Sequence, residues 1–161
     1  MLISLLGLHL IKVTFFKNRI NIFLVLTILL LSPTFVWMIK NHPFQYVYFN
    51  ILAGKDFNKN FEMDYWGLSN TMSLEYIAKN ENEVVKVSGL GTSDLNLSNS
   101  FLPKKYKNKL LITSEINDSK YLINNYRNWL GKDLSVPQNY EIFYEIKIDE
   151  IPINTIYRKN E

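Results

Sequence analysis

The chain has 161 residues, enough for one domain of ordinary size but too few for a complete polytopic membrane enzyme. Its formal charge of +3 is unevenly distributed: residues 1–50 contain four basic residues and no Asp or Glu, whereas residues 51–161 contain fourteen basic and 15 acidic residues. This near-neutral second part argues against a nucleic-acid-binding protein, and the absence of cysteine excludes a disulfide framework, a thiolate metal site and a cysteine nucleophile.

Residues 1–11 (MLISLLGLHLI) are apolar but too few to cross a bilayer, so we expect the end of a partial apolar helix. The basic residues that follow, Lys12, Lys17 and Arg19, predict a cytoplasmic loop over residues 12–19. Lys40, Lys55 and Lys59 place a similar charge beyond the next apolar stretch. Charge alone therefore does not fix the orientation of the chain in a membrane.

Residues 20–39 (INIFLVLTILLLSPTFVWMI) contain no charged side chain. At about 1.5 Å per residue they reach about 30 Å, the thickness of the hydrocarbon core of a bilayer. They predict a transmembrane helix and the lipid bilayer as a partner. Thr27 and Ser32 can bond to their own helix backbone, and Pro33 is expected to kink or divide the span.

The segment 40–68 is rich in aromatic residues, and ten of the chain's 23 aromatic side chains lie between Phe35 and Trp66. Such rings commonly anchor a helix end at the headgroup layer. The alternative is a ligand site at the membrane surface, where rings stack on sugars and polar tips bond their hydroxyl groups. The candidate substrate-binding residues in this segment are His42, Gln45, Tyr46, Tyr48, Asn50, Asp64 and Trp66.

Residues 69–161 have the pattern of a small α/β domain. A helix capped by Ser69 or Asn70 is expected to end near residues 79–82. Strands are expected at residues 84–88 and 110–113, with a helix at 92–101 between them, which makes a βαβ unit. A third strand is expected at residues 121–124, but only seven residues separate it from the second, too few for an ordinary parallel crossover. Its neighbour in the sheet remains open.

The alternation at residues 140–148 predicts a strand with one buried face, formed by Tyr140, Ile142, Tyr144, Ile146 and Ile148. A turn at Asp149 and Glu150 precedes a partner strand that starts at Pro152. The predicted fold class is therefore α/β: an N-terminal transmembrane helix followed by a small mixed sheet with a C-terminal antiparallel hairpin.

Other constellations give weaker functional signals. Gly89-Leu90-Gly91 lies between a strand and a helix, as in dinucleotide sites, but the third glycine is missing and an ordinary turn is preferred. Glu62 and Asp64 are a candidate acid/base pair, against the commoner structural role of carboxylates. Arg127 follows the third strand and is a candidate ligand for phosphate or carboxylate. We expect no metal site, no cofactor and no serine triad.

Four stretches also carry a resemblance: HPFQYVYFN at 42–50, FEMDYWGLSNTMSLEYI at 61–77, YLINNYRNW at 121–129 and EIPINTIYR at 150–158. Together they resemble the last membrane helix and extracytoplasmic domain of bacterial dolichyl-phosphate-mannose mannosyltransferase-like membrane glycosyltransferases (GT-C type, family 39-like). The resemblance implies that residues 41–161 face the outside of the bacterial cytoplasmic (inner) membrane, and that the sugar donor is a polyprenyl-phosphate carrier.

In that family the catalytic Asp lies in the first extracytoplasmic loop, which has no counterpart here, so no catalytic residue is assigned. The resemblance implies a non-catalytic C-terminal module or fragment whose partners are a membrane-embedded catalytic half and a lipid-linked sugar, and no nucleic acid. Two alternatives stay open. One is a stand-alone membrane-anchored binding module, and the other is the product of a truncated reading frame.

Overall fold

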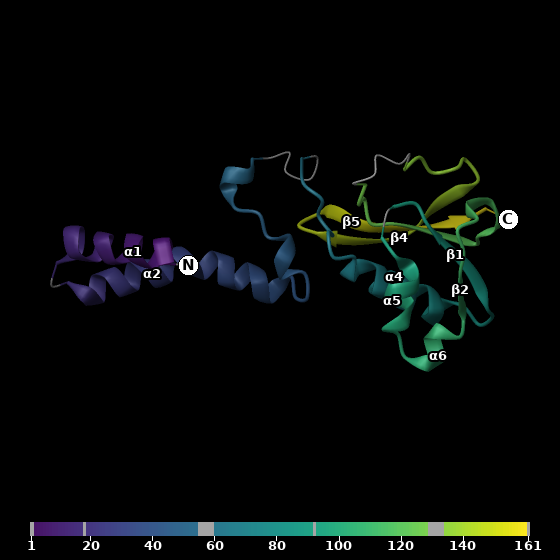
Figure 1. Cartoon of the computed structure of the whole chain (residues 1–161), viewed down its shortest axis with the longest axis horizontal. Helices are drawn as coiled ribbons and strands as arrows, with labels where there is room; N and C mark the ends of the chain where they lie inside the picture. The colour runs from purple at the N-terminus through teal and green to yellow at the C-terminus, as the bar shows by residue number, and fades with distance from the viewer. Residues whose placement is uncertain (1, 18, 55–59, 92, 129–133, 161) are drawn as a thin grey trace. The chain divides into compact units, whose positions relative to one another are not determined.

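The structure is a computed structural model that describes residues 2–17, 19–54, 60–91, 93–128 and 134–160 (Figure 1). Lys55, Lys59, Thr92 and Trp129, which figured in the sequence analysis, lie outside the described residues. The chain divides into two compact units, residues 1–48 and residues 49–161.

Unit 1 is almost entirely helical. Helix α1 (Leu2–Ile11) continues as a π-helical stretch, η1 (Lys12–Phe16), and α2 spans Ile20–Lys40. The prediction of a loop over residues 12–19 is therefore wrong for its first five residues. The helical hydrogen bonds continue beyond the apolar run, and the turn lies between Phe16 and Ile20, where the Arg19 amide donates to the Phe16 carbonyl at 2.6 Å.

Helix α2 confirms the predicted apolar span and extends one residue beyond it, to Lys40. Within the described parts of the chain it is the helix that is long and apolar enough to cross a membrane, and none of its side chains is buried. Pro33 does not divide it. The proline removes a donor to the Leu29 carbonyl, and the Ser32 hydroxyl donates to that same carbonyl at 3.0 Å. Thr27 likewise donates to the Phe23 carbonyl at 2.8 Å.

Two single-turn 3₁₀ helices follow α2, η2 (Gln45–Val47) and η3 (Ile51–Ala53). Unit 2 then forms the α/β domain, with helices α4 (Leu68–Asn80), α5 (Leu95–Ser100) and α6 (Lys104–Lys107) and the 3₁₀ turn η4 (Ile116–Asp118). Its strands are β1 (Val85–Gly89), β2 (Leu110–Ile112), β3 (Tyr121–Asn124), β4 (Tyr140–Ile148) and β5 (Ile151–Lys159). Helix α6 was not predicted.

The five strands form one mixed sheet in the order β2-β1-β3-β5-β4. Strand β1 pairs in parallel with β2 and β3, and β5 pairs antiparallel with β3 and β4. The open question of the third strand's neighbour is thus resolved, because β3 pairs with β1 and β5. The short connection over residues 113–120 suffices because Val87 of β1 pairs with both Ile112, the last residue of β2, and Tyr121, the first residue of β3. The chain therefore crosses β1 without running back along it.

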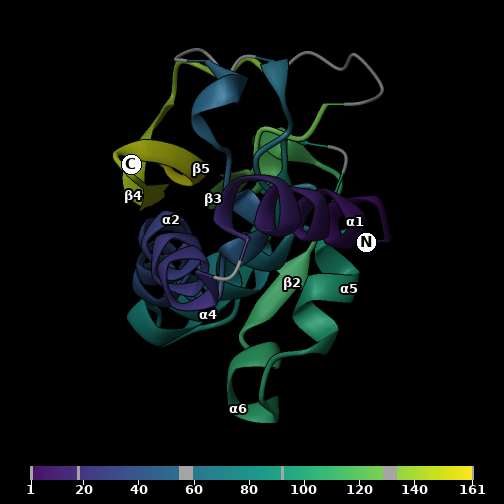
Figure 2. The same ribbon diagram turned by 90° about the vertical axis from the view of Figure 1, so that its left-hand side faces the viewer.

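The main hydrophobic core lies between one face of the sheet and the helices (Figure 2). Leu74 and Ile77 of α4 and Leu95 of α5 pack there against strand residues such as Val87 and Ile156. The other face carries a smaller cluster around Leu90, Leu122 and Tyr140, against which partly buried loop residues pack. The parallel strands are therefore covered on both faces, as parallel sheets require, although by helices on one side only.

The predicted buried face of β4 is wrong in its middle. Ile142 is 60% exposed, and Phe143 packs against the main core instead. The cause is a β-bulge: Ile142 pairs with Tyr157 and Tyr144 with Ile156, so Phe143 is an extra residue that reverses the alternation. The C-terminal hairpin is confirmed, with Asp149 and Glu150 both at positive φ in its two-residue turn.

Candidate functional site

The predicted site residues fall into both units. His42, Gln45, Tyr46 and Tyr48 belong to unit 1, and Asn50, Asp64, Trp66 and Arg127 belong to unit 2. Each group is therefore described by itself.

In unit 1, the aromatic residues pack on the carboxyl end of α2. The Tyr48 hydroxyl lies 2.9 Å from the Thr34 hydroxyl, and its ring meets the Trp37 ring edge to face at 5.1 Å between centroids. Tyr46 makes a similar contact with Phe44 at 6.3 Å, and the Gln45 amide nitrogen lies 2.6 Å from His42 Nδ1. These contacts fold the segment on itself and fit the anchoring role of such rings.

Asn50 and Asp64 both serve the backbone. The Asn50 side chain accepts a hydrogen bond from the Leu52 amide at 3.0 Å. Asp64 is fully buried, and its carboxylate accepts from the Leu68 amide at 3.1 Å, the Ser69 amide at 3.2 Å and the Ser69 hydroxyl. Asp64 therefore caps α4, and the predicted cap at Ser69 or Asn70 is wrong, because Gly67 (φ 68°) makes a tight turn that brings Asp64 back.

Arg127 packs against the same turn. Its guanidinium lies 4.4 Å from the centroid of the Tyr65 ring, and its Nε lies 3.7 Å from the Glu62 carboxylate. Glu62 also accepts a hydrogen bond from the Asn128 amide at 3.3 Å. The ring of Tyr65 meets the Trp66 ring at 5.2 Å, nearly perpendicular. We call Glu62, Tyr65, Trp66 and Arg127 the aromatic corner.

The aromatic corner combines rigid support with exposed rings. Tyr65 is 48% exposed and Trp66 is 77% exposed, although both lie in a turn fixed by the buried Asp64. Exposing an indole ring has no packing benefit, whereas a rigid exposed ring beside a guanidinium and a carboxylate can stack on a sugar and bond its hydroxyl groups. Glu62 and Asp64 have separate structural partners, so the proposed acid/base pair has no support in this geometry.

The loop after β3 locks onto the turn that carries the corner. Asn125 is buried and donates to the Asp64 carbonyl at 3.3 Å and to the Ser93 hydroxyl at 2.7 Å. Tyr126 has a positive φ of 57°, stabilised by a hydrogen bond from its amide to the Asn124 side chain at 2.8 Å. Residues 125–127 were expected to form a binding loop, with Arg127 as its candidate ligand. The structural role of Asn125 was not predicted, since its only signal was a polar side chain directly after the strand.

The glycine motif after β1 contacts this loop. A Cβ placed on Gly91 would lie 2.9 Å from the Asn125 side-chain oxygen and 3.0 Å from the Arg127 carbonyl oxygen. The space that a phosphate would occupy beside this glycine in a dinucleotide site is therefore filled by the protein's own chain. Among the described residues there is also no group of three or more His, Asp or Glu side chains that could hold a metal ion.

A second network lies beneath the corner, between α4 and β5. The buried Asn154 donates to the Ser69 hydroxyl at 2.8 Å and the Asn70 side chain at 2.9 Å, and accepts from the Ser73 hydroxyl at 2.9 Å. The periodicity of β5 did not reveal this residue. The network fixes the start of α4 against the sheet, so that the corner is held from two sides.

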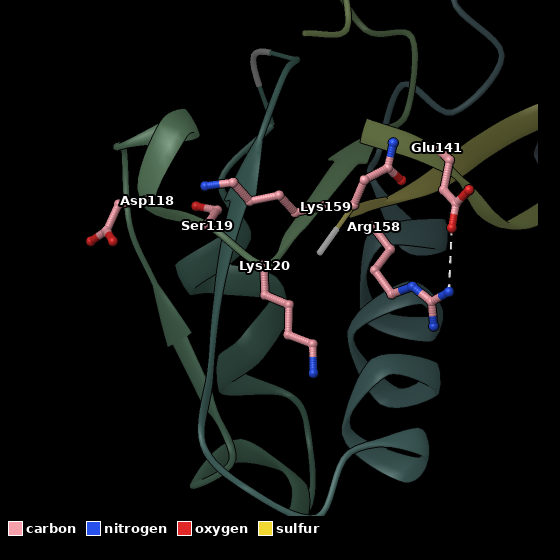
Figure 3. A pocket seen from close by; sticks show the side chains of 7 residues that line it. Asp118, Ser119, Lys120, Glu141, Arg158 and Lys159 are labelled. Atoms are coloured by element: carbon pink, nitrogen blue, oxygen red, sulfur yellow. Dashed lines mark hydrogen bonds and ion pairs between the residues drawn. The ribbon is translucent and has the colours of Figure 1, made fainter. Parts of the chain in front are cut away.

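The opposite end of strands β1 and β3 carries a groove of about 690 Å³ (Figure 3). It is lined by Asp118, Ser119, Lys120, Glu141, Arg158, Lys159 and Asn160. Arg158 pairs with Glu141 at 3.3 Å, Lys120 with Glu81 at 2.6 Å, and Asp118 with Lys86. Most of the charge in the groove is therefore satisfied within the protein.

Glu81, at the groove end of the strands, has a carboxylate with two close partners, Lys120 and Tyr121. Burial acts to raise its pKa, but the ammonium of Lys120 and the Tyr121 hydroxyl, which donates at 2.6 Å, together hold the pKa below its usual range. Burial and the same carboxylate raise the pKa of the Tyr121 phenol. The groove thus has the character of a structural ion-pair network rather than a catalytic site.

The chain matches no protein-family model, no curated protein and no solved structure, so the candidate site rests on its own geometry.

Proposed function

We propose that the chain is the membrane-anchored, non-catalytic C-terminal module of a bacterial glycosyltransferase, and that the aromatic corner contacts the glycan. The enzyme would transfer a sugar from a polyprenyl-phosphate carrier to an extracytoplasmic acceptor. Helix α2 would hold the module in the cytoplasmic membrane, with unit 2 on the outer side.

One observation supports this proposal most directly. The stretches 61–77 and 121–129, which carry the resemblance, meet in space through the contacts of Glu62 with Arg127 and of Asn125 with the Asp64 backbone. Those contacts serve to present Tyr65 and Trp66 to solvent. A motif whose buried residues fix exposed aromatic rings is expected of a ligand-contacting surface.

The first experiment tests the catalytic partner. The full chain, tagged and extracted from its host membrane in mild detergent, is expected to co-purify with a protein of several membrane spans. Membranes that lack the chain should lose lipid-dependent sugar transfer and regain it with the wild-type chain. If the tagged chain instead purifies from its host membrane alone and monodisperse, the proposal is contradicted.

The second experiment tests the corner itself. Replacing Trp66 with Ala should lower transfer by about fivefold to a hundredfold, because one stacked ring contributes about 1–3 kcal/mol in comparable aromatic contacts. Lys86→Gln is the matched control, since Lys86 pairs with Asp118 at the opposite end of the sheet and should leave transfer unchanged. If both variants transfer sugar at the same rate, the aromatic corner does not contact the glycan.

A stand-alone membrane-anchored binding module is the second candidate. It is favoured by the hydrophobic clusters described in unit 2, which are formed from its own residues. It predicts that residues 60–161 fold alone, with a cooperative thermal transition, and that no membrane protein co-purifies with the full chain. Aggregation of that fragment would count against this candidate.

A further inference from the structure

Helices α5 and α6 form a protruding tip of unit 2, and both views place α6 at an extremity of that unit (Figures 1 and 2). Leu97 is 57% exposed and Phe101 is 72% exposed. They are four positions apart, so they share one side of the α5 turn. Two large apolar side chains are thus presented to solvent at the end of the domain.

The same tip carries a concentrated positive charge. Residues 95–114 contain no Asp or Glu and include Lys104, Lys105, Lys107 and Lys109. The first three are exposed, and in the described part of the chain none of the three forms an ion pair. Lys105 lies over the Tyr106 ring at 4.5 Å. The charge of this tip is therefore uncompensated.

Lys109 shows how the tip is supported. Its ammonium donates to the Ala78 carbonyl at 3.1 Å and the Glu81 carbonyl at 2.7 Å, at the carboxyl end of α4. Leu102, between α5 and α6, is buried in the main core. The tip is thus fixed to the domain by Lys109 and Leu102, while the other three lysines form no ion pair with the described residues and the two apolar side chains remain exposed.

The tip differs from the groove at the end of β5, where nearly every charge has a partner. Arg158 and Lys120 face carboxylates there, whereas Lys104, Lys105 and Lys107 do not. Because residues 51–161 have a net charge of −1, a patch of three unpaired lysines is a strong local asymmetry. Such a patch indicates an anionic partner.

We propose that the α5–α6 tip docks on anionic phospholipid headgroups of the bilayer that α2 crosses. Lysines near an anionic membrane surface are attracted to its phosphates, and an exposed Phe beside them inserts at the headgroup boundary. An acidic polynucleotide would satisfy the lysines but leave Phe101 and Leu97 in water. The apolar residues therefore favour the membrane over the other polyanion.

The segment that connects α2 to the α/β domain is long enough to let the tip reach the membrane surface. Residues 41–67 join α2 to α4, and an extended chain covers about 3.3 Å per residue. Helix α4, with 13 residues, is about 20 Å long. A surface tethered so close to its membrane meets it at a high effective concentration, so a weak contact suffices. The docking requires α2 to lie in a bilayer but needs no transferase partner.

The test uses the full chain, which contains no cysteine, reconstituted into vesicles. Ser100→Cys, exposed between Leu97 and Phe101, receives an environment-sensitive fluorophore; the control reporter is Glu150→Cys in the hairpin turn. In vesicles of phosphatidylcholine mixed with phosphatidylglycerol, the label at residue 100 is expected to shift to the blue. Lipid-borne quenchers should also reach it, and salt should reverse both effects. The control label should show neither.

Charge and apolar variants then locate the contact. The triple change Lys104→Gln, Lys105→Gln and Lys107→Gln is expected to lower the ratio of docked to undocked tip by on the order of a hundred-fold, at about fivefold per lysine. Phe101→Ser should reduce quenching with little change in salt dependence. Lys147→Gln should change neither. Unaltered melting curves would show that the variants fold.

Three results would overturn the proposal. The label at residue 100 could give the same signal in pure phosphatidylcholine vesicles as in the anionic mixture, or the triple variant could dock as well as the wild type. The label could also respond to added single-stranded DNA and not to anionic lipid, which would identify a nucleic-acid surface. None of these results depends on a catalytic partner, so they are distinguishable from failure of the proposed function.

Discussion

The two ends of the parallel strands contrast in how they use polar residues. At the end near Asp64, buried polar side chains bind backbone groups of other segments. At the groove end, largely exposed charged side chains bind each other, as Arg158 does with Glu141. Buried hydrogen bonds are costly to leave unmade, whereas exposed ion pairs contribute little. The contrast therefore predicts that single substitutions at the first end destabilise the domain far more than those at the second.

The largest effect is expected for Asp64→Ala. The variant loses the α4 cap and leaves the Leu68 amide and the buried donors of Ser69 without an acceptor. We expect unfolding to become easier by about 3 kcal/mol, the sum of a lost cap and an unmet buried group. Urea unfolding of the full chain in detergent, followed by near-UV circular dichroism, measures this. Asp64→Asn keeps one acceptor and should cost less; equal losses would contradict the capping role.

The next effect is expected for Gly91→Ala. The added methyl group would meet the Asn125 side chain and the Arg127 backbone, neither of which can withdraw freely. Overpacking of this kind costs about 1–3 kcal/mol, and the same unfolding experiment detects it. Gly7→Ala is the control, since no heavy atom lies within 4 Å of the added group. An unchanged urea midpoint for Gly91→Ala would show that the loop after β3 can move to make room for the methyl group.

A smaller, pH-dependent effect is expected at Glu81. Its pKa is lowered in the folded protein, so its contribution is present above the unfolded-state pKa and is lost as pH falls through the folded pKa. Glu81→Gln should therefore destabilise the domain by about 1 kcal/mol at neutral pH and flatten the acid limb of the stability profile. Parallel profiles for wild type and variant would show that Lys120 and Tyr121 do not stabilise the carboxylate.

The smallest effect is expected for the pair Arg158 and Glu141. Both side chains are about half exposed, at 43% and 56%. A double-mutant cycle with Arg158→Gln and Glu141→Gln should give a coupling energy of about 0.5 kcal/mol that disappears in high salt. Arg158→Gln alone should cost somewhat more, because the guanidinium also lies over the Phe143 ring at 4.8 Å. A coupling above 2 kcal/mol would abolish the contrast between the two ends.

The sequence predicts much of the fold because each of its signals is local. The uncharged run at 20–39 and the positions of β1, β2, β3 and the terminal hairpin follow from composition and alternation. Alternation fails at Phe143, because a bulge depends on how two strands pair and not on either strand alone. The place of β3 beside β1 likewise depends on the register in which β2 and β3 pair with β1.

The candidate site was predicted only in part. Residue type identified Asp64, Trp66 and Arg127 as noteworthy, but Asp64 proves to be a helix cap, and Arg127 contacts Tyr65 and Glu62. Asn125 and Asn154 act across 61 and 84 residues of chain, on Asp64 and Asn70. Contacts over such separations leave no periodic trace in the sequence, so they became visible only with the fold.

The place of β5 in the sheet has a consequence for biosynthesis. This strand is inserted between β3 and β4, yet it lies at residues 151–159, far behind the apolar helix at 20–40. The sheet therefore cannot close while those residues are still being translated, although the apolar helix has long since been synthesised. If that helix crosses a bilayer, we expect it to enter before the sheet forms, so that the domain folds late and already tethered.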